Sequence, residues 1–238
     1  MRYELHYWPD IPGRGEFVRL ALEAAAADYI DVARLEGPGK GMAATMRLMD
    51  QAVQRHPPFA PPFLRVGDVL IAQTANILQY LGPRLGLAPK AEAGRLWAHQ
   101  LQLTVTDFVA EVHDTHHPIG VDLHYHQQKP EARRRTKHFL AGRVPKYFGY
   151  FESVLAANHG RMVGRRLSYV DLAMFQMVAG MRYAFPQTMA KREGDWPGLA
   201  ALHERVARHP NVAAYLASKR RIPFNEDGIF RHYPELDR

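Results

Sequence analysis

Two proline pairs stand directly before a short apolar run in HPPFAPPFLRVGDVLIAQT, residues 56–74. Proline has no backbone N–H and cannot donate to a sheet ladder, so within sheets it is confined to edges, bulges and strand starts. The segments FLRV and VLIA follow, and the Gly67-Asp68 pair between them predicts an antiparallel hairpin. Pro61-Pro62 therefore marks the start of a strand, at a point where the N–H side has no ladder partner.

The rest of the first 82 residues predicts a small α/β unit. Tyr3, Leu5 and Tyr7 recur at every second position, which is the period of a half-buried strand. The further elements expected are a helix near Phe17, a strand over 29–33, a helix whose core face holds Met42, Met46, Met49 and Val53, the hairpin, and a helix from Thr74. The predicted order is β-α-β-α-β-β-α.

After a segment rich in proline and glycine, the remaining sequence has helical spacing throughout. A proline at position 145 predicts a bend in the second of these helices, which runs from about Pro130 to Asn158. Ser168 and Asp171 have the spacing of a capping box at the start of another. The other helices are expected to begin near Ala91, at Trp196-Pro197 and at Pro210. We therefore expect an α/β domain over 1–82, a linker over 83–90 and an all-helical domain over 91–238.

Composition excludes several kinds of chemistry. The chain has no cysteine, so disulfides, thiolate metal sites and protein-thiol nucleophiles are excluded, and any sulfur chemistry must use a thiol brought by a ligand. The net charge is +7, but the basic residues are scattered in short groups such as 133–135 and 219–221, which favours a solvated basic surface over a nucleic-acid site. No apolar stretch approaches the ~18 residues of a membrane span. A cytoplasmic protein that binds neither membrane nor nucleic acid is expected.

A small βαβ–ββα unit with a proline at the entry of its third strand is typical of the thioredoxin fold. Followed by a helical domain, it resembles the cytosolic glutathione S-transferase family. The residues that carry the resemblance are LHYW and GRGEFVR within 5–19, Pro62, QTANILQYL at 73–81, Asp107, VPKYFGYFESVL at 144–155 and LSYVDL at 167–172. The tyrosine-type subfamilies (alpha, mu, pi and sigma) are the nearest likeness. Residues 35–61 are longer than expected and rich in Gly, Pro and Met, so the chain is interpreted as a divergent, bacterial-style member.

The resemblance implies a catalytic role for Tyr7. Family members activate the thiol of glutathione, their co-substrate, with a hydroxyl or cysteine near the end of the first strand. No Ser, Thr or Cys precedes Thr45, so Tyr7 is the candidate, and its O–H can donate to the glutathione sulfur and stabilise the thiolate. On the sequence pattern alone, a strand tyrosine packed in the core is an equal alternative.

The resemblance also implies a set of glutathione-binding residues. Gln73 and Thr74 stand at a helix start, where free N–H groups bind anions, and suit the γ-glutamyl end, although Thr74 also fits a plain N-cap. Asp107 lies 34 residues after Gln73, where the family places a carboxylate that reaches across a homodimer. Arg14 aligns with a family arginine at the first helix. The glycine carboxylate is expected to meet a basic side chain, and the sequence leaves Lys40, Arg47 and Arg55 open.

The proline pair has a specific place in this resemblance. Pro62 lies eleven residues before Gln73, the interval of the family's cis-proline, so a cis bond is expected before it. The residue before that proline ordinarily offers glutathione both its N–H and its C=O. Pro61 can offer only its C=O, which predicts weaker glutathione binding than the fold can support.

Three histidines, His113, His116 and His117, fall at i, i+3 and i+4. This spacing suits a metal, but no cysteine or carboxylate-rich context accompanies it, and no metal is expected. In the family this helix end borders the electrophile pocket, so His113 and His117 are interpreted as pocket residues with Trp8 and Ile11; plain exposed histidines are an equal alternative.

The function that follows is glutathione transfer to a small-molecule electrophile by a homodimer. Two alternatives stay open. One is a binding or interaction protein on the same fold that holds glutathione without activating it, or does not hold it. The other is a basic module associated with nucleic acid or translation.

Overall fold

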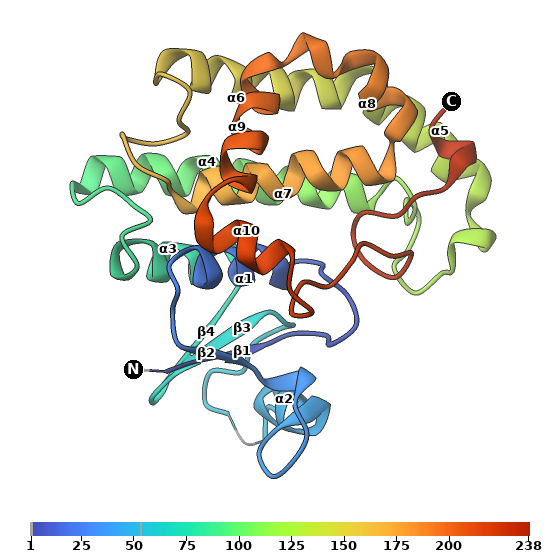
Figure 1. Cartoon of the computed structure of the whole chain (residues 1–238). Helices are drawn as coiled ribbons and strands as arrows, with labels where there is room; N and C mark the ends of the chain where they lie inside the picture. The colour runs from blue at the N-terminus through green and yellow to red at the C-terminus, as the bar shows by residue number, and fades with distance from the viewer. Residues whose placement is uncertain (1, 53) are drawn as a thin grey trace.

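A mixed β-sheet forms the centre of the N-terminal part of the protein (Figure 1). The computed structural model describes residues 2–52 and 54–238, and in these residues the strands are β1 (Tyr3–His6), β2 (Tyr29–Asp31), β3 (Phe63–Val66) and β4 (Val69–Ala72). Their order is β2-β1-β3-β4; β1 and β2 run parallel, and the other two pairs are antiparallel. The hairpin predicted around Gly67-Asp68 is confirmed, with Val66 paired to Val69.

Helices cover both faces of this sheet. Helices α1 (Gly15–Ala24) and α3 (Thr74–Arg84) lie on the side of the helical domain, and α2 (Gly41–Met49) lies on the opposite side (Figure 1). The predicted order βαβαββα is confirmed. The buried methionine face predicted for the second helix is wrong, since Met46 is 48% exposed and only Thr45 of α2 is buried. No further layer covers the outer face of α2 in the described residues, and Val53 lies outside them.

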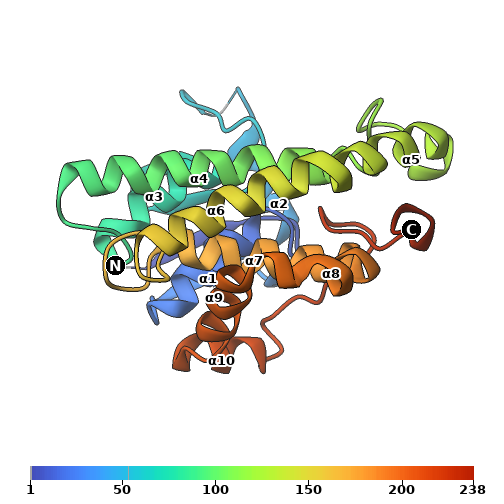
Figure 2. The same cartoon turned by 90° about the horizontal axis from the view of Figure 1, so that it is seen from above.

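The C-terminal part is helical, as expected (Figure 2). Its helices are α4 (Glu92–His113), α5 (Lys129–His138), α6 (Val144–Ala157), α7 (Tyr169–Ala184), α8 (Pro186–Arg192), α9 (Pro197–Ala207) and α10 (Pro210–Leu216). A turn of π-helix, Phe139–Arg143, separates α5 from α6 directly before Pro145. Proline lacks an N–H and clashes with the carbonyl four residues earlier, and a local widening of the helix accommodates both effects. This interruption of the regular helix lies where Pro145 predicts a bend.

Helix α1 joins the two parts of the protein because all ten of its residues are buried. On one face Val18 and Leu22 pack into the core of the sheet, while Phe17 and Leu20 pack into the core of the helical part on the other. A helix that is apolar on both faces has no stable exposed position. The start of α1 is therefore held rigidly between the two cores.

Side-chain caps fix the ends of two C-terminal helices. The predicted capping box is confirmed: Ser168 Oγ accepts from the Asp171 N–H at 3.2 Å, and Asp171 Oδ2 accepts from the Ser168 N–H at 2.8 Å. At the start of α8, Asp237 accepts hydrogen bonds from the N–H groups of Gln187 and Thr188 at 2.6 and 3.0 Å. This cap ties down the last residues of the chain. Among the described residues, no helix combines the length and apolar character needed to cross a membrane.

Candidate active site

Tyr7 follows the last residue of β1 directly, and its side chain is only 4% exposed. Its hydroxyl oxygen accepts a hydrogen bond from the backbone N–H of Arg14, at 2.8 Å, just before α1. Within the described residues the Tyr7 O–H proton has no acceptor. That proton is therefore available to a ligand that approaches the hydroxyl.

Two glycines surround the Tyr7 ring, and sequence reasoning did not single them out. A Cβ added at Gly13 would overlap the Tyr7 hydroxyl, and one added at Gly15 would overlap the ring carbons. Gly13 also has a φ of +43°, a left-handed conformation that glycine adopts without strain. The segment GRG therefore allows the chain to close around the tyrosine, and this motif was the available signal in the sequence.

Burial raises the pKa of Tyr7 above its ordinary value of 10. The Arg14 N–H bond and the charges of Arg14 and Arg19 lower the same pKa, but burial outweighs them. At neutral pH the hydroxyl therefore keeps its proton. It can act as a hydrogen-bond donor to an anion and not as a base.

Tyr7, Pro62 and Gln73 stand in a row across one edge of the sheet. In the ladders His6 pairs with Phe63, and Phe63 pairs with Ala72. One residue beyond these pairs, the register sets Tyr7 beside Pro62 and Pro62 beside Gln73. The end of β1 and the two ends of the β3–β4 hairpin thus meet at this edge.

The predicted cis bond lies between Pro61 and Pro62, and both residues are buried. Pro61 has no N–H, so this part of the edge presents carbonyl oxygens only. Strand β3 begins at Phe63, directly after the proline pair, as the sequence predicts.

The start of α3 has backbone N–H groups that no side chain caps. Gln73 is exposed, has a φ of +69°, unusual for a residue with a side chain, and gives α3 no side-chain cap. Thr74 Oγ1 is buried and has no hydrogen-bond partner in the described residues. The first N–H groups of α3 and this hydroxyl suit a carboxylate or another anion. The plain N-cap role considered for Thr74 is absent, since its side chain makes no capping bond.

Arg14, predicted to be a glutathione-binding residue, lies near Thr74. Both line a void of about 10 Å³, together with Gln102 of α4. Gln102 Oε1 is buried without a partner in the described residues, and sequence reasoning missed it. A void of this size holds about one water molecule, which can bridge such groups.

Asp107 lies on the outer face of α4 and is exposed, without a hydrogen bond or ion pair in the described residues. Leu96 and Leu103 lie on the same helix and are 59% and 47% exposed. The structure of one chain therefore does not bring Asp107 to Tyr7. Any contact between this carboxylate and the site requires a second chain.

The three candidates for a carboxylate partner are separated. Lys40 and Arg47 line one cavity of about 490 Å³ between α2 and the sheet, together with His6 and Arg65. Arg55 is exposed in the segment before β3 and is not among the residues that line this cavity. The structure groups two of the three.

The C-terminal tail connects the loop after β1 with the end of α4, which no sequence signal indicated. Asn225 Nδ2 donates to the carbonyl of Asp10 at 2.8 Å, and a Cβ added at Gly228 would stand 3.8 Å from Pro12. Ile229 O accepts from His116 Nε2 at 2.8 Å. The tail thus places the histidines beside the loop 8–13.

The predicted pocket residues come from these two segments. Trp8 is 37% exposed and Ile11 is half-buried in the loop after β1. His113 and His117 lie at the end of α4, and the charge of Arg14 acts on His113. Burial, followed by the charges of His117, Arg231 and Arg14, lowers the pKa of His113 to about 4.

Comparison with known proteins gives a consistent result. Residues 113–219 match the family described as glutathione S-transferase, C-terminal domain. A glutathione S-transferase of Plasmodium falciparum is 24% identical over 223 residues, which cover 90% of this chain and 95% of that protein. A probable glutathione S-transferase 7 of Caenorhabditis elegans is 26% identical over 228 residues, covering 94% and 100%.

A solved structure, the pi-class glutathione S-transferase of Onchocerca volvulus, superimposes with a TM-score of 0.71 at 22% identity, over 96% of this chain and 99% of that one. The chain therefore has the glutathione S-transferase fold. The bacterial style expected from the sequence finds no support in these relatives, which are eukaryotic. Over nearly its whole length the chain is thus similar to glutathione S-transferases, and residues 113–219 match the C-terminal domain of that family.

Proposed function

We propose that the protein is a glutathione transferase in which the Tyr7 hydroxyl stabilises the thiolate of bound glutathione. The thiolate then attacks an electrophilic carbon of a small molecule. The observation that carries this proposal is the Tyr7 hydroxyl itself, which is buried, protonated at neutral pH and without an acceptor in the described residues. An O–H that donates to a thiolate favours the ionised sulfur and lowers its pKa.

The row of Tyr7, Pro62 and Gln73 supports a specific orientation of glutathione. The γ-glutamyl carboxylate binds the N–H groups at the start of α3 with Gln73 and Thr74, and Arg14 stands behind them. The cysteinyl N–H of glutathione donates to the C=O of Pro61, and the thiol reaches Tyr7. The glycine carboxylate extends toward the cavity that Lys40 and Arg47 line.

The electrophile pocket is proposed to lie between the loop after β1, the end of α4 and the C-terminal tail. Trp8 and Ile11 supply its apolar surface, and His113 and His117 supply its polar one. The hydrogen bond from Asn225 to Asp10 holds the tail against this loop.

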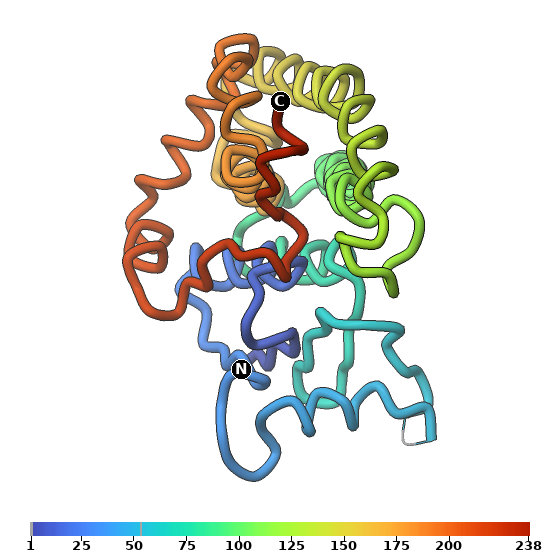
Figure 3. The backbone as a smooth tube through the Cα atoms, turned by 90° about the vertical axis from the view of Figure 1, so that its right-hand side faces the viewer, coloured from blue at the N-terminus to red at the C-terminus, as the bar shows by residue number. Residues whose placement is uncertain are grey.

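A homodimer is proposed as the functional unit. Exposed apolar side chains follow α4, among them Leu96 and Leu103, and Phe59, in the segment before β3, is 94% exposed. This segment lies on the same side of the molecule as α4 (Figures 2 and 3). A second copy packed on this side would cover these groups and bring Asp107 to its neighbour's glutathione amino group.

The test of the proposed function is Tyr7→Phe, which removes the hydroxyl and keeps the ring. Turnover with an aryl halide is expected to fall by roughly ten- to a hundredfold, or about 1.4–2.7 kcal/mol in barrier, while glutathione affinity changes little. Tyr3→Phe is the matched control, since Tyr3 lies in β1, four residues before Tyr7, and its hydroxyl makes no hydrogen bond in the described residues. Unchanged turnover in Tyr7→Phe would disprove the assignment. Retention of glutathione without turnover in the wild type would show a binding protein instead.

A further inference from the structure

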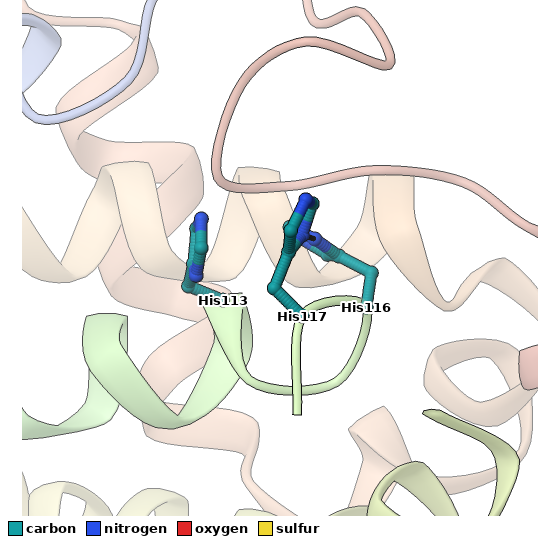
Figure 4. A group of neighbouring side chains, drawn as sticks. All are labelled: His113, His116 and His117. Carbon is teal, nitrogen blue, oxygen red and sulfur yellow. Dashed lines mark hydrogen bonds between the residues drawn. The ribbon is translucent and has the colours of Figure 1, made fainter. Parts of the chain in front are cut away.

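The three histidines at the end of α4 converge on one point. His113 belongs to the last turn of α4, and His116 and His117 belong to the turn that follows. Figure 4 shows the three rings extending from this turn toward the C-terminal tail. Their ring centroids are 4.7–4.9 Å apart, and one nitrogen of each lies within 4.8 Å of the other two.

The hydrogen bonds of His116 fix which of its nitrogens is free to bind a ligand. His116 Nε2 lies 2.8 Å from the carbonyl oxygen of Ile229, and a carbonyl only accepts, so Nε2 carries the proton. His116 Nδ1 then has a lone pair, which accepts a hydrogen bond from His117 Nδ1 at 2.5 Å, so a metal ion bound here would take the place of the proton between the two rings. A carbonyl that holds the second nitrogen of a histidine is the usual support of a metal-binding imidazole.

We propose that His113, His116 and His117 bind one divalent transition-metal ion of the zinc type. Imidazole nitrogens bind zinc at about 2.0–2.1 Å, so in a tetrahedral site two of them stand about 3.3 Å apart. The nitrogens of this cluster lie within 4.8 Å of one another, and the Nδ1 atoms of His116 and His117 are 2.5 Å apart, so metal binding requires rotation of the rings that separates this pair. Three protein ligands leave a fourth position for water or an anionic ligand.

The surroundings select the type of ion. In the described residues no carboxylate belongs to the cluster, and the chain has no cysteine, so the donors are imidazoles alone. Imidazole suits zinc, cobalt, nickel and copper, whereas calcium and magnesium need oxygen donors.

Positive charge beside the cluster favours an anion as the fourth ligand. The charge of Arg231 acts on all three histidines, and the charge of Arg14 acts on His113. A hydroxide or a thiolate at the open position offsets both the ion and these guanidinium groups. The site shares His113 and His117 with the proposed electrophile pocket and adds a metal ion to it. It replaces the expectation of no metal, which rested on the sequence context and not on the convergence of the rings.

The test uses the full-length protein without a histidine tag, freed of metal with a chelator. Calorimetric titration with Zn²⁺ is expected to give one ion per chain, and Co²⁺ is expected to give the strong visible absorption of a tetrahedral site. His113→Gln and His117→Leu each remove one ligand and keep the His116 bond to Ile229. Each is expected to weaken Zn²⁺ binding by roughly a hundredfold or more, because even partners outside the ligand set contribute ten- to a hundredfold.

The matched control is the double variant His124→Ala and His126→Ala, which removes the other stacked histidine pair, with ring centroids 5.5 Å apart. Its Zn²⁺ affinity is expected to equal that of the wild type, as is the affinity of Tyr7→Phe, so failure of the transferase proposal leaves this test intact. Absence of Zn²⁺ binding to the wild type would overturn the proposal. So would equal binding by His113→Gln and His117→Leu, or loss of binding in the control instead.

Discussion

Glu16→Gln is expected to destabilise the fold strongly, because Glu16 is a fully buried carboxylate at the start of α1. Glu16 Oε1 accepts from the Tyr215 hydroxyl at 2.8 Å and pairs with Arg221, and Oε2 lies 3.4 Å from Arg19 Nη1. These contacts join α1 to α10 and to the segment that follows it. The substitution keeps the size and removes the charge.

The size of the stability loss depends on which partners Arg19 and Arg221 keep when the Glu16 carboxylate is removed. Arg19 keeps a 2.6 Å bond to Asp31, whereas Arg221, only 13% exposed, keeps no carboxylate in the described residues. Removing one partner of a buried ion pair costs about 3–5 kcal/mol, and the surviving Arg19 pair favours the lower end. A loss of about 3 kcal/mol in the free energy of unfolding corresponds to roughly 6–12 °C in melting temperature for a chain of this size.

Urea unfolding followed by circular dichroism measures this loss, with thermal unfolding as a second readout. Glu204→Gln is the matched control, because Glu204 is 52% exposed and its pairs with Arg182 and Arg208 are worth less than about 1 kcal/mol. A Glu16→Gln variant within about 1 kcal/mol of the wild type would refute the reasoning. So would an equal loss in the two variants.

Three further predictions concern pH, the dimer and glutathione affinity. Burial lowers the pKa of His6 from 6.5 to about 4. Between pH 6.5 and 4, His6 is therefore protonated in the unfolded chain and neutral in the folded chain. The free energy of unfolding is therefore expected to fall by about 3 kcal/mol as the pH falls from 6.5 to 4. In urea unfolding, the His6→Gln variant should show a weaker dependence of this free energy on pH than the wild type. Identical pH dependence in the two proteins would contradict the prediction. Asp107→Asn is expected to weaken glutathione binding in calorimetry without unfolding the protein, since it removes a charge-assisted bond, and a fully active monomer in sizing experiments would count against the dimer. Pro61→Val supplies a backbone N–H and is expected to tighten glutathione binding two- to twelvefold, from one hydrogen bond of about 0.5–1.5 kcal/mol; equal or poorer affinity in a folded variant would argue against it.

Local signals in the sequence predicted much of the fold. The Gly67-Asp68 turn fixed the hairpin register, because a two-residue connection leaves little freedom in strand pairing. The capping box of Ser168 and Asp171 located the start of α7. The eleven-residue interval from Pro62 to Gln73 predicted the cis bond before Pro62, and these two residues lie beside Tyr7 in the row at the sheet edge. Each of these features depends on neighbours in the sequence.

Features that depend on tertiary packing were missed or misjudged. The alternating pattern of β1 predicts that His6 lies on the solvent-exposed face of the strand. In the structure α2 covers that face, and His6 is buried. The methionines of α2 have core spacing, yet no second layer packs on them in the described residues. Helix α8 and the tail are placed by Asp237, which lies 49 residues beyond Thr188. The buried amide of Gln102 joins the site only because α4 crosses α1 and α3 there.

The central claim is that Tyr7 stabilises the thiolate of bound glutathione, and the pKa of that thiol tests it most directly. Titration of the ultraviolet thiolate absorption of glutathione bound to the wild type and to Tyr7→Phe measures this pKa in both. A free cysteine thiol has a pKa of about 8.5, and a shift of two units corresponds to about 2.7 kcal/mol. We predict a pKa about two units lower for glutathione on the wild type, and a value close to that of the free thiol on Tyr7→Phe. Equal pKa values on the two proteins would contradict the claim.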